Sequence, residues 1–176
     1  EPPEIVTAWL ALTPSNLENG CMEVVPGSHL RGQVSHHDTF GDDNMLSRGQ
    51  EVAVDISREK TEAIELEAGQ MSLHHVRIFH GSKTNPTNTP RIGFAMRFIP
   101  THVKQNGGRT FALLVRGHDE FNHFDRPNLP ETELGVAEWK MHQDSLKRMN
   151  SVLLKDSAQA TKVKGHQSLK TDEKFS

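Results

Sequence analysis

The sequence predicts a mainly β fold that ends in one C-terminal α-helix, and two patterns support this class. Short runs of apolar and β-branched residues follow one another closely as far as Ile99, with Gly, Pro and Asn turns between them, which is typical of a β-sandwich or barrel. After Pro130, apolar residues recur at steps of three and four, which indicates an amphipathic helix. The 176 residues suffice for one compact domain.

The first half of the chain contains two predicted strands and an irregular segment. Residues 5–12 are an apolar, partly β-branched run bounded by turn residues and predict a buried strand. Asn19-Gly20 is a strong turn signal, so residues 21–25 are expected to form a hairpin partner. Residues 31–50 have no hydrophobic period, and we expect a loop that borders the active site.

The second half contains further short strands and then a helix. Apolar patterns between turn residues predict strands over residues 51–55, 63–66, 71–79 and 92–99. A helix is predicted over residues 131–154, because Glu131 and Glu133 suit a first helical turn and apolar or aromatic residues follow at helical spacing. These are Trp139, His142, Leu146, Met149 and Leu153. The polar tail after the helix is expected to be frayed or disordered.

Composition and charge narrow the range of partners. The formal net charge of −3 provides no general attraction for nucleic acid or an anionic membrane, and no apolar run is long enough for a membrane helix. The single cysteine, Cys21, cannot form an internal disulfide, which favours a reducing compartment and a cytoplasmic location. Because the first residue is Glu1 rather than Met, we expect that the sequence begins in mid-protein.

Three segments in a fixed order contain the residues with the most specific chemistry. They are AWLALTPSNLENGCMEVVPGSH (residues 8–29), AGQMSLHHVRIFHGS (residues 68–82) and PRIGFAMRF (residues 90–98). In this order and spacing they resemble the phytanoyl-CoA dioxygenase family over roughly residues 1–120. The resemblance implies a double-stranded β-helix (a jelly-roll, cupin-like fold) over residues 1–125. Residues 126–176 would then be the C-terminal helix and flexible tail of the same domain.

The resemblance also implies a reaction. Such enzymes hold one Fe(II) between two histidines and a carboxylate, which leaves positions on the metal for the cosubstrate 2-oxoglutarate and for O₂. The expected activity is hydroxylation of an unactivated C–H bond of a small molecule, with decarboxylation of 2-oxoglutarate to succinate. Two alternatives stay open: a 2-oxoglutarate-dependent halogenase of the same family, and a jelly-roll binding module without metal.

The resemblance places the second iron-binding histidine at His80, in the sequence His80-Gly81-Ser82. A neutral imidazole at the end of a buried strand is a suitable ligand for Fe(II). Gly81 is expected to let the backbone turn away from the metal without a Cβ clash. His74 and His75 precede the ligand, and strand alternation lets only one of them point inward, which we predict to be His75.

Arg91 stands eleven residues after His80 and is the predicted partner of 2-oxoglutarate. A planar guanidinium binds a carboxylate in a bidentate manner, which lysine does not match. Arg97 lies six residues further on and would face the same side of a regular strand, so periodicity does not choose between the two arginines. The resemblance favours Arg91, and it adds the Ser82 hydroxyl and the Trp9 indole to the oxoacid pocket.

The first two iron ligands of the family form a His-x-Asp pair upstream of the strand that holds Trp9, so we expect them before Glu1. Two such strings occur within the chain. His142-x-Asp144 falls in the predicted helix, where residues two apart project about 200° from each other and do not chelate one metal. His36-x-Asp38 would suit chelation in an extended segment, but it follows the Pro-Gly-Ser-His turn and remains the weaker alternative.

Overall fold

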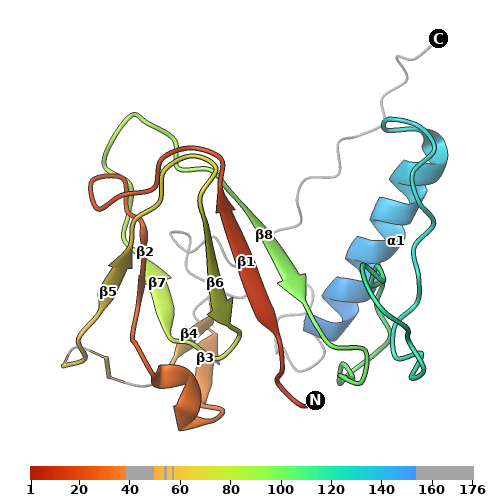
Figure 1. The fold of residues 1–176 in the computed structure, drawn as a ribbon, viewed down its shortest axis with the longest axis horizontal. Coiled ribbons are helices and arrows are strands. Elements are labelled where there is room, and N and C mark those ends of the chain that lie inside the picture. The colour runs from red at the N-terminus through yellow and green to blue at the C-terminus, as the bar shows by residue number, and fades with distance from the viewer. Residues whose placement is uncertain (39–49, 54, 57, 154–176) are drawn as a thin grey trace. The chain divides into compact units, whose positions relative to one another are not determined.

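The computed structural model describes residues 1–38, 50–53, 55–56 and 58–153. In chain order the elements are β1 (Val6–Ala11), β2 (Met22–Val24), the 3₁₀ helix η1 (Ser28–Arg31), β3 (His36–Asp38), β4 (Gln50–Val52), β5 (Glu62–Ile64), β6 (Met71–His75), β7 (His80–Ser82), β8 (Gly93–Phe98) and α1 (Val136–Leu153) (Figure 1). The predicted class, mainly β with a C-terminal helix, is therefore confirmed.

The chain divides into two compact units. The first contains residues 1–35, 52–105 and 114–123, and it includes both three-stranded sheets. The described part of the second contains residues 36–38, 50–51, 106–113 and 124–153, including α1.

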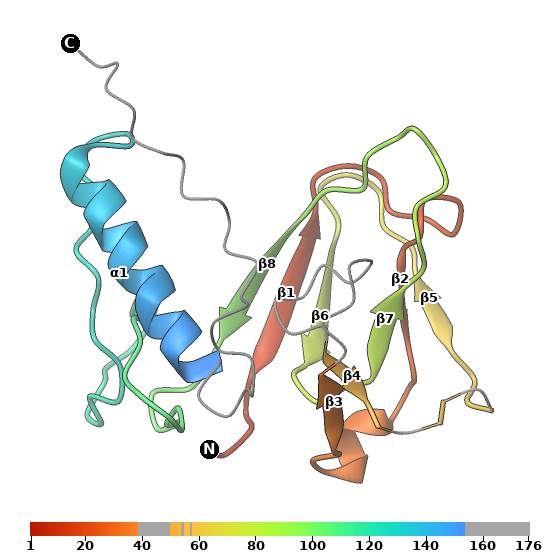
Figure 2. The same ribbon diagram turned by 180° about the vertical axis from the view of Figure 1, so that it is seen from behind.

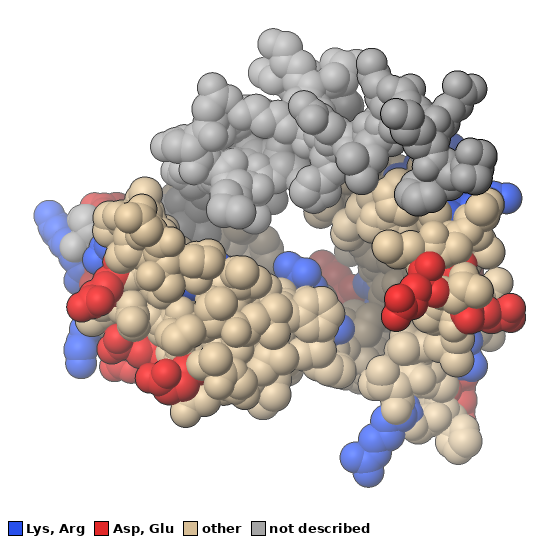
Figure 3. Space-filling model, turned by 90° about the horizontal axis from the view of Figure 1, so that it is seen from above, with Lys and Arg blue, Asp and Glu red and all other residues tan. Residues whose placement is uncertain are grey.

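Among the described residues, no helix combines the length and apolar character that crossing a bilayer requires. On the face drawn in Figure 3, acidic and basic side chains both occur among the described residues without forming a broad patch of one sign.

The first sheet has β1 at its centre, between β6 and β8, and both pairings are antiparallel (Figures 1 and 2). Its register sets Thr7 opposite His74 on one side and Arg97 on the other. Trp9 lies opposite Ser72 and Ala95 in the same way. Directly paired residues point to the same face of a sheet. Thr7, Trp9 and their partners therefore share one face.

The second sheet has the order β5-β2-β7, again with antiparallel pairs. The predicted hairpin between the first two strands is wrong, because β2 pairs with β5 and β7 and not with β1. The physical reason is the segment between them: Ser15 forms a β-bridge with Leu66, and the following turn leads the chain into the second sheet. His80 then lies opposite Val24, and Ser82 lies opposite Met22.

The turn at Asn19-Gly20 is confirmed. The Cys21 N–H donates to the Asn16 carbonyl at 2.8 Å, and Gly20 has a φ of +73°. A Cβ at Gly20 would lie 2.4 Å from the Lys83 carbonyl oxygen. Only glycine meets both the positive φ and this close approach.

Several predicted boundaries need correction. The strand predicted over 71–79 is interrupted after His75, where the Ile78 N–H donates to the His75 carbonyl at 3.1 Å in a turn, and β7 begins only at His80. The segment predicted as an irregular loop contains β3 and the start of β4, whereas residues 39–49 lie outside the described residues. The strands predicted over 51–55, 63–66 and 92–99 correspond to β4, β5 and β8 with shifted ends.

In the second unit, α1 begins at Val136, five residues later than predicted. The reason is local: Leu134 has a positive φ of 54°, so the chain does not continue as a helix through it. The Glu138 carboxylate reaches back to this loop and accepts hydrogen bonds from the Glu131 N–H at 2.9 Å, the Thr132 N–H at 3.1 Å and the Thr132 hydroxyl at 3.0 Å. The predicted tail lies outside the described residues.

These hydrogen bonds lower the pKa of Glu138 from its ordinary value of 4.5 to about 2, with the Glu131 N–H as the largest cause. Because this pKa is lower in the folded chain than in the unfolded chain, the stabilisation is complete above pH 4.5 and is lost as the pH falls toward 2. We expect Glu138→Gln to lower the melting temperature at pH 6 and to have little effect near pH 2. Thermal unfolding followed by circular dichroism measures both, and an equal effect at the two pH values would contradict the assignment.

Candidate functional site

His80 is the first residue of β7, and its side chain is exposed. Its Nδ1 atom lies 2.9 Å from the carbonyl oxygen of Ile78. Since a carbonyl oxygen only accepts, Nδ1 must carry the proton, and in the neutral ring the lone pair is on Nε2. This is the tautomer that a metal ligand needs, with a carbonyl holding the second nitrogen.

His74, and not His75, lies beside His80. The two ring centroids are 5.7 Å apart. Burial lowers the pKa of the half-buried His74, and the nearby His80 and Arg97 lower it further. The prediction for His75 is wrong because β6 alternation turns it to the other face, where its ring lies 5.4 Å from that of His29.

Trp9 and Arg91 form a second pair. The guanidinium carbon of Arg91 lies 5.8 Å from the centroid of the Trp9 ring, which is within the range of a cation–π contact. Both side chains are half-buried. The position of the Trp9 indole also requires a glycine at Gly93 in β8, because a Cβ there would lie 2.1 Å from Cζ2 of Trp9. The close packing of Trp9 on Gly93 therefore fixes the surface against which Arg91 rests.

One member of each pair, His74 or Trp9, lies on the same face of the first sheet. Thr7 and Trp9 are two residues apart on β1, a separation of roughly 6.8 Å, and they point to the same side. His74 is the cross-strand partner of Thr7, so its side chain shares this face with Trp9. The ring contact between His74 and His80 shows that the face is turned toward β7 of the second sheet.

The remaining predicted residues lie as follows. Ser82 is exposed and, two residues after His80, is on the same side of β7. Arg97 is the other cross-strand partner of Thr7, so it lies on the same face near His74. The proximity of Arg97 to His74 could not be found from the sequence, because the pairing of β6 and β8 with β1 is not visible in residue spacing.

The two His-x-Asp strings are in different elements. His142-x-Asp144 lies in α1, as predicted, and so is not a chelating pair. His36-x-Asp38 forms β3 rather than part of a loop, and the side chain of Asp38 lies outside the described residues. In the part of the chain that the structure describes, no three His, Cys, Asp or Glu side chains gather as a metal site.

A Cβ at Gly81 would meet no atom of the chain within 4 Å, and the expected role of Gly81 beside a bound metal stays a prediction. This makes Gly81 a matched control for Gly93. We expect Gly93→Ala to displace the Trp9 ring and to destabilise the fold by about 1–3 kcal/mol, the usual range for overpacking. Gly81→Ala should be nearly neutral. Urea unfolding gives the stability, and fluorescence in a Trp139→Phe background reports Trp9; an unchanged Trp9 emission in Gly93→Ala would contradict the packing described.

Comparisons with known proteins identify a family and similar folds. The sequence profile of the family described as Phytanoyl-CoA dioxygenase (PhyH) matches residues 1–93 of the 176. A phytanoyl-CoA dioxygenase from Arabidopsis thaliana is 27% identical over 131 residues, which are 74% of this chain and 41% of that protein.

Two solved structures of the non-heme monooxygenase ThoJ are similar over most of the chain. The apo form has a TM-score of 0.70 at 32% identity and covers 85% of this chain and 53% of its own. The ThoJ–Ni complex has a TM-score of 0.67 at 28% identity and covers 86% of this chain and 52% of its own. The chain thus spans about half the length of ThoJ and less than half of the Arabidopsis protein. Because the family profile matches more than half of its residues, the chain belongs to the phytanoyl-CoA dioxygenase family.

Proposed function

We propose that the full-length protein containing this chain is an Fe(II)- and 2-oxoglutarate-dependent dioxygenase that hydroxylates an unactivated C–H bond of a small molecule. The observation that carries the proposal is the arrangement of His80 and Arg91, one with its Nε2 available for a metal and the other held against Trp9. We further propose that the two sheets are parts of a double-stranded β-helix, which would enclose these groups. Residues 1–125 and 126–176 would belong to this one domain.

His80 fits the role of an iron ligand. The Ile78 carbonyl fixes the ring in the tautomer with a lone pair on Nε2, and His80 is exposed. The other two ligands are expected to be the His-x-Asp pair of the family, upstream of Glu1. The similarity to the ThoJ–Ni complex supports a metal centre in this fold.

Arg91 fits the role of the 2-oxoglutarate anchor. Its guanidinium offers two parallel donors to the distal carboxylate, and contact with the Trp9 ring limits the orientations that the fork adopts before the cosubstrate binds. Ser82, on the same side of β7 as His80, would donate its hydroxyl to the same carboxylate. Trp9 would also form an apolar wall that keeps water from the oxoacid.

The bound iron would supply the activation of O₂, so that substrate, O₂ and 2-oxoglutarate give hydroxylated substrate, succinate and CO₂. The chain's own residues place the participants. His80 would hold the iron at one position and Arg91 would orient the oxoacid, and His74, whose pKa is lowered by burial, lies beside His80.

The test is succinate formation by the full-length protein under air. We expect succinate only when Fe(II) and 2-oxoglutarate are both present, even without a substrate, through slow uncoupled turnover. A chlorinated product in the presence of chloride would support the halogenase alternative of the same family. A complete absence of succinate from folded protein with Fe(II) would favour a binding module without metal and would overturn the proposal.

A further inference from the structure

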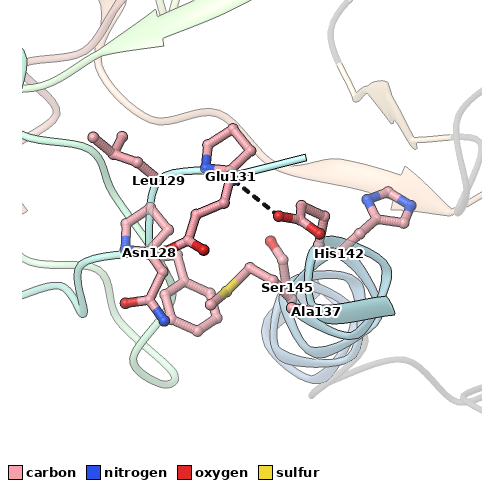
Figure 4. A pocket seen from close by; sticks show the side chains of 11 residues that line it. Asn128, Leu129, Glu131, Ala137, His142 and Ser145 are labelled. Carbon is pink, nitrogen blue, oxygen red and sulfur yellow. Dashed lines mark hydrogen bonds between the residues drawn. The ribbon is translucent and has the colours of Figure 1, made fainter. Parts of the chain in front are cut away.

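A cavity of about 460 Å³ lies in the second unit, between residues 127–131 and one face of α1 (Figure 4). Its apolar walls include the side chains of Phe111, Leu129 and Met141. A volume of this size is within the usual range of sites that bind small molecules. None of its lining residues belongs to the unit that contains His80 and Arg91, so it is not part of the proposed oxoacid site.

The loop that forms one side of the cavity is held in place before any ligand binds. The Glu138 carboxylate, on α1, accepts three hydrogen bonds from Glu131 and Thr132 at 2.9–3.1 Å. These bonds connect the first turn of the helix to the loop (Figure 4). A cavity whose walls are already fixed loses less conformational entropy on binding than one that must first be ordered.

The charge of the lining is negative. Glu131 and Glu138 both line the cavity, whereas no lysine or arginine does. The hydrogen bonds from the loop already occupy the Glu138 oxygens. Figure 4 shows the Glu131 carboxylate reaching into the space between the loop and the helix, and it has no hydrogen-bond partner among the described residues. Asn128 and Ser145 add neutral polar groups to the same lining.

We propose that this cavity binds a small molecule with an apolar body and a protonated amine. The ammonium group would donate a charge-assisted hydrogen bond to the Glu131 carboxylate. The apolar body would cover Phe111, Leu129 and Met141 and so remove their surfaces from water. An anionic ligand is disfavoured, because it would meet two carboxylates and no fixed cation in the lining.

The probe for the test is 2-phenylethylamine, titrated calorimetrically into the full-length protein at pH 7 without iron or 2-oxoglutarate. Success or failure is thus independent of the proposed oxygenase activity. We expect saturable one-to-one binding of the amine, weaker binding of 2-phenylethanol and no binding of 3-phenylpropanoate. Equal affinity for the amine and the alcohol, or no binding of the amine, would overturn the proposal.

Variants locate the binding site. Glu131→Gln should weaken amine binding by about tenfold or more, the effect of losing one charged hydrogen bond. It preserves the backbone N–H that donates to Glu138. Glu133→Gln, an equal change of charge at an exposed residue outside the lining, is the matched control and should bind the amine normally. Ala137→Leu, at an exposed lining position, should block the cavity. If Glu131→Gln and Ala137→Leu, both folded by circular dichroism, bound the amine as the unmodified protein does, the site would be elsewhere and the proposal wrong.

Discussion

Replacing His80 by alanine in the full-length protein is expected to lower Fe(II) affinity by more than about 100-fold and to abolish succinate formation. Removing only the group that hydrogen-bonds to a metal ligand lowers metal affinity about 10- to 100-fold, and here the ligand itself is removed. The fold should persist, because His80 is exposed and, among the described residues, its ring makes only the hydrogen bond to Ile78 and the contact with His74. Iron affinity is measured by anaerobic titration, and succinate by chromatography.

The matched control is His118→Ala, because His118 is an exposed histidine of the same unit, outside the site. It should bind iron and form succinate as the unmodified protein does. Retention of normal turnover in His80→Ala would show that iron is held elsewhere, and the assignment of His80 would then be wrong.

Replacing Arg91 by glutamine is expected to raise the KM for 2-oxoglutarate by about 30-fold or more. Removing one partner of a hydrogen-bonded charge pair typically costs 2–5 kcal/mol, and the distal carboxylate would be left without its cation. The KM of Arg91→Lys for 2-oxoglutarate should lie between those of the unmodified protein and Arg91→Gln, because an ammonium retains the charge but not the bidentate geometry. Initial rates of succinate formation over a range of 2-oxoglutarate concentrations give KM and kcat separately.

Arg97→Gln is the decisive comparison, since Arg97 lies in β8 on the sheet face near His74, whereas Arg91 precedes this strand. We expect its KM for 2-oxoglutarate to change less than threefold. A larger increase for Arg97→Gln than for Arg91→Gln would transfer the role of oxoacid anchor from Arg91 to Arg97.

Local patterns were sufficient to predict several elements. The first strand follows from its apolar run, and the turn at Asn19-Gly20 follows from the need for a positive φ at Gly20, a requirement of one residue and its immediate neighbours. The helix was predicted from its spacing, but its start was placed too early. The negative charges of Glu131 and Glu133 suit a first helical turn and equally suit the loop before the helix, so they do not locate its start. In the structure both residues precede α1, and the Glu131 N–H donates to the Glu138 carboxylate.

Pairing between distant strands was not predictable from one sequence. Asn19-Gly20 led to the expectation that the second strand would return along the first, whereas β2 pairs with strands about 40 and 60 residues further on. The choice between His74 and His75 failed for the same reason. Alternation shows that they face opposite sides, but only the register with Thr7 shows which side faces His80. The close approach of Gly93 to Trp9 likewise depends on this register.

The most direct test of the site is an anaerobic titration of the full-length protein with Fe(II) and 2-oxoglutarate, followed by the visible charge-transfer absorbance of an iron-bound oxoacid. We predict a band that requires both components, is lost in His80→Ala and needs much more 2-oxoglutarate in Arg91→Gln. A band of full strength in His80→Ala, or none in the unmodified protein, would contradict an iron centre built on His80.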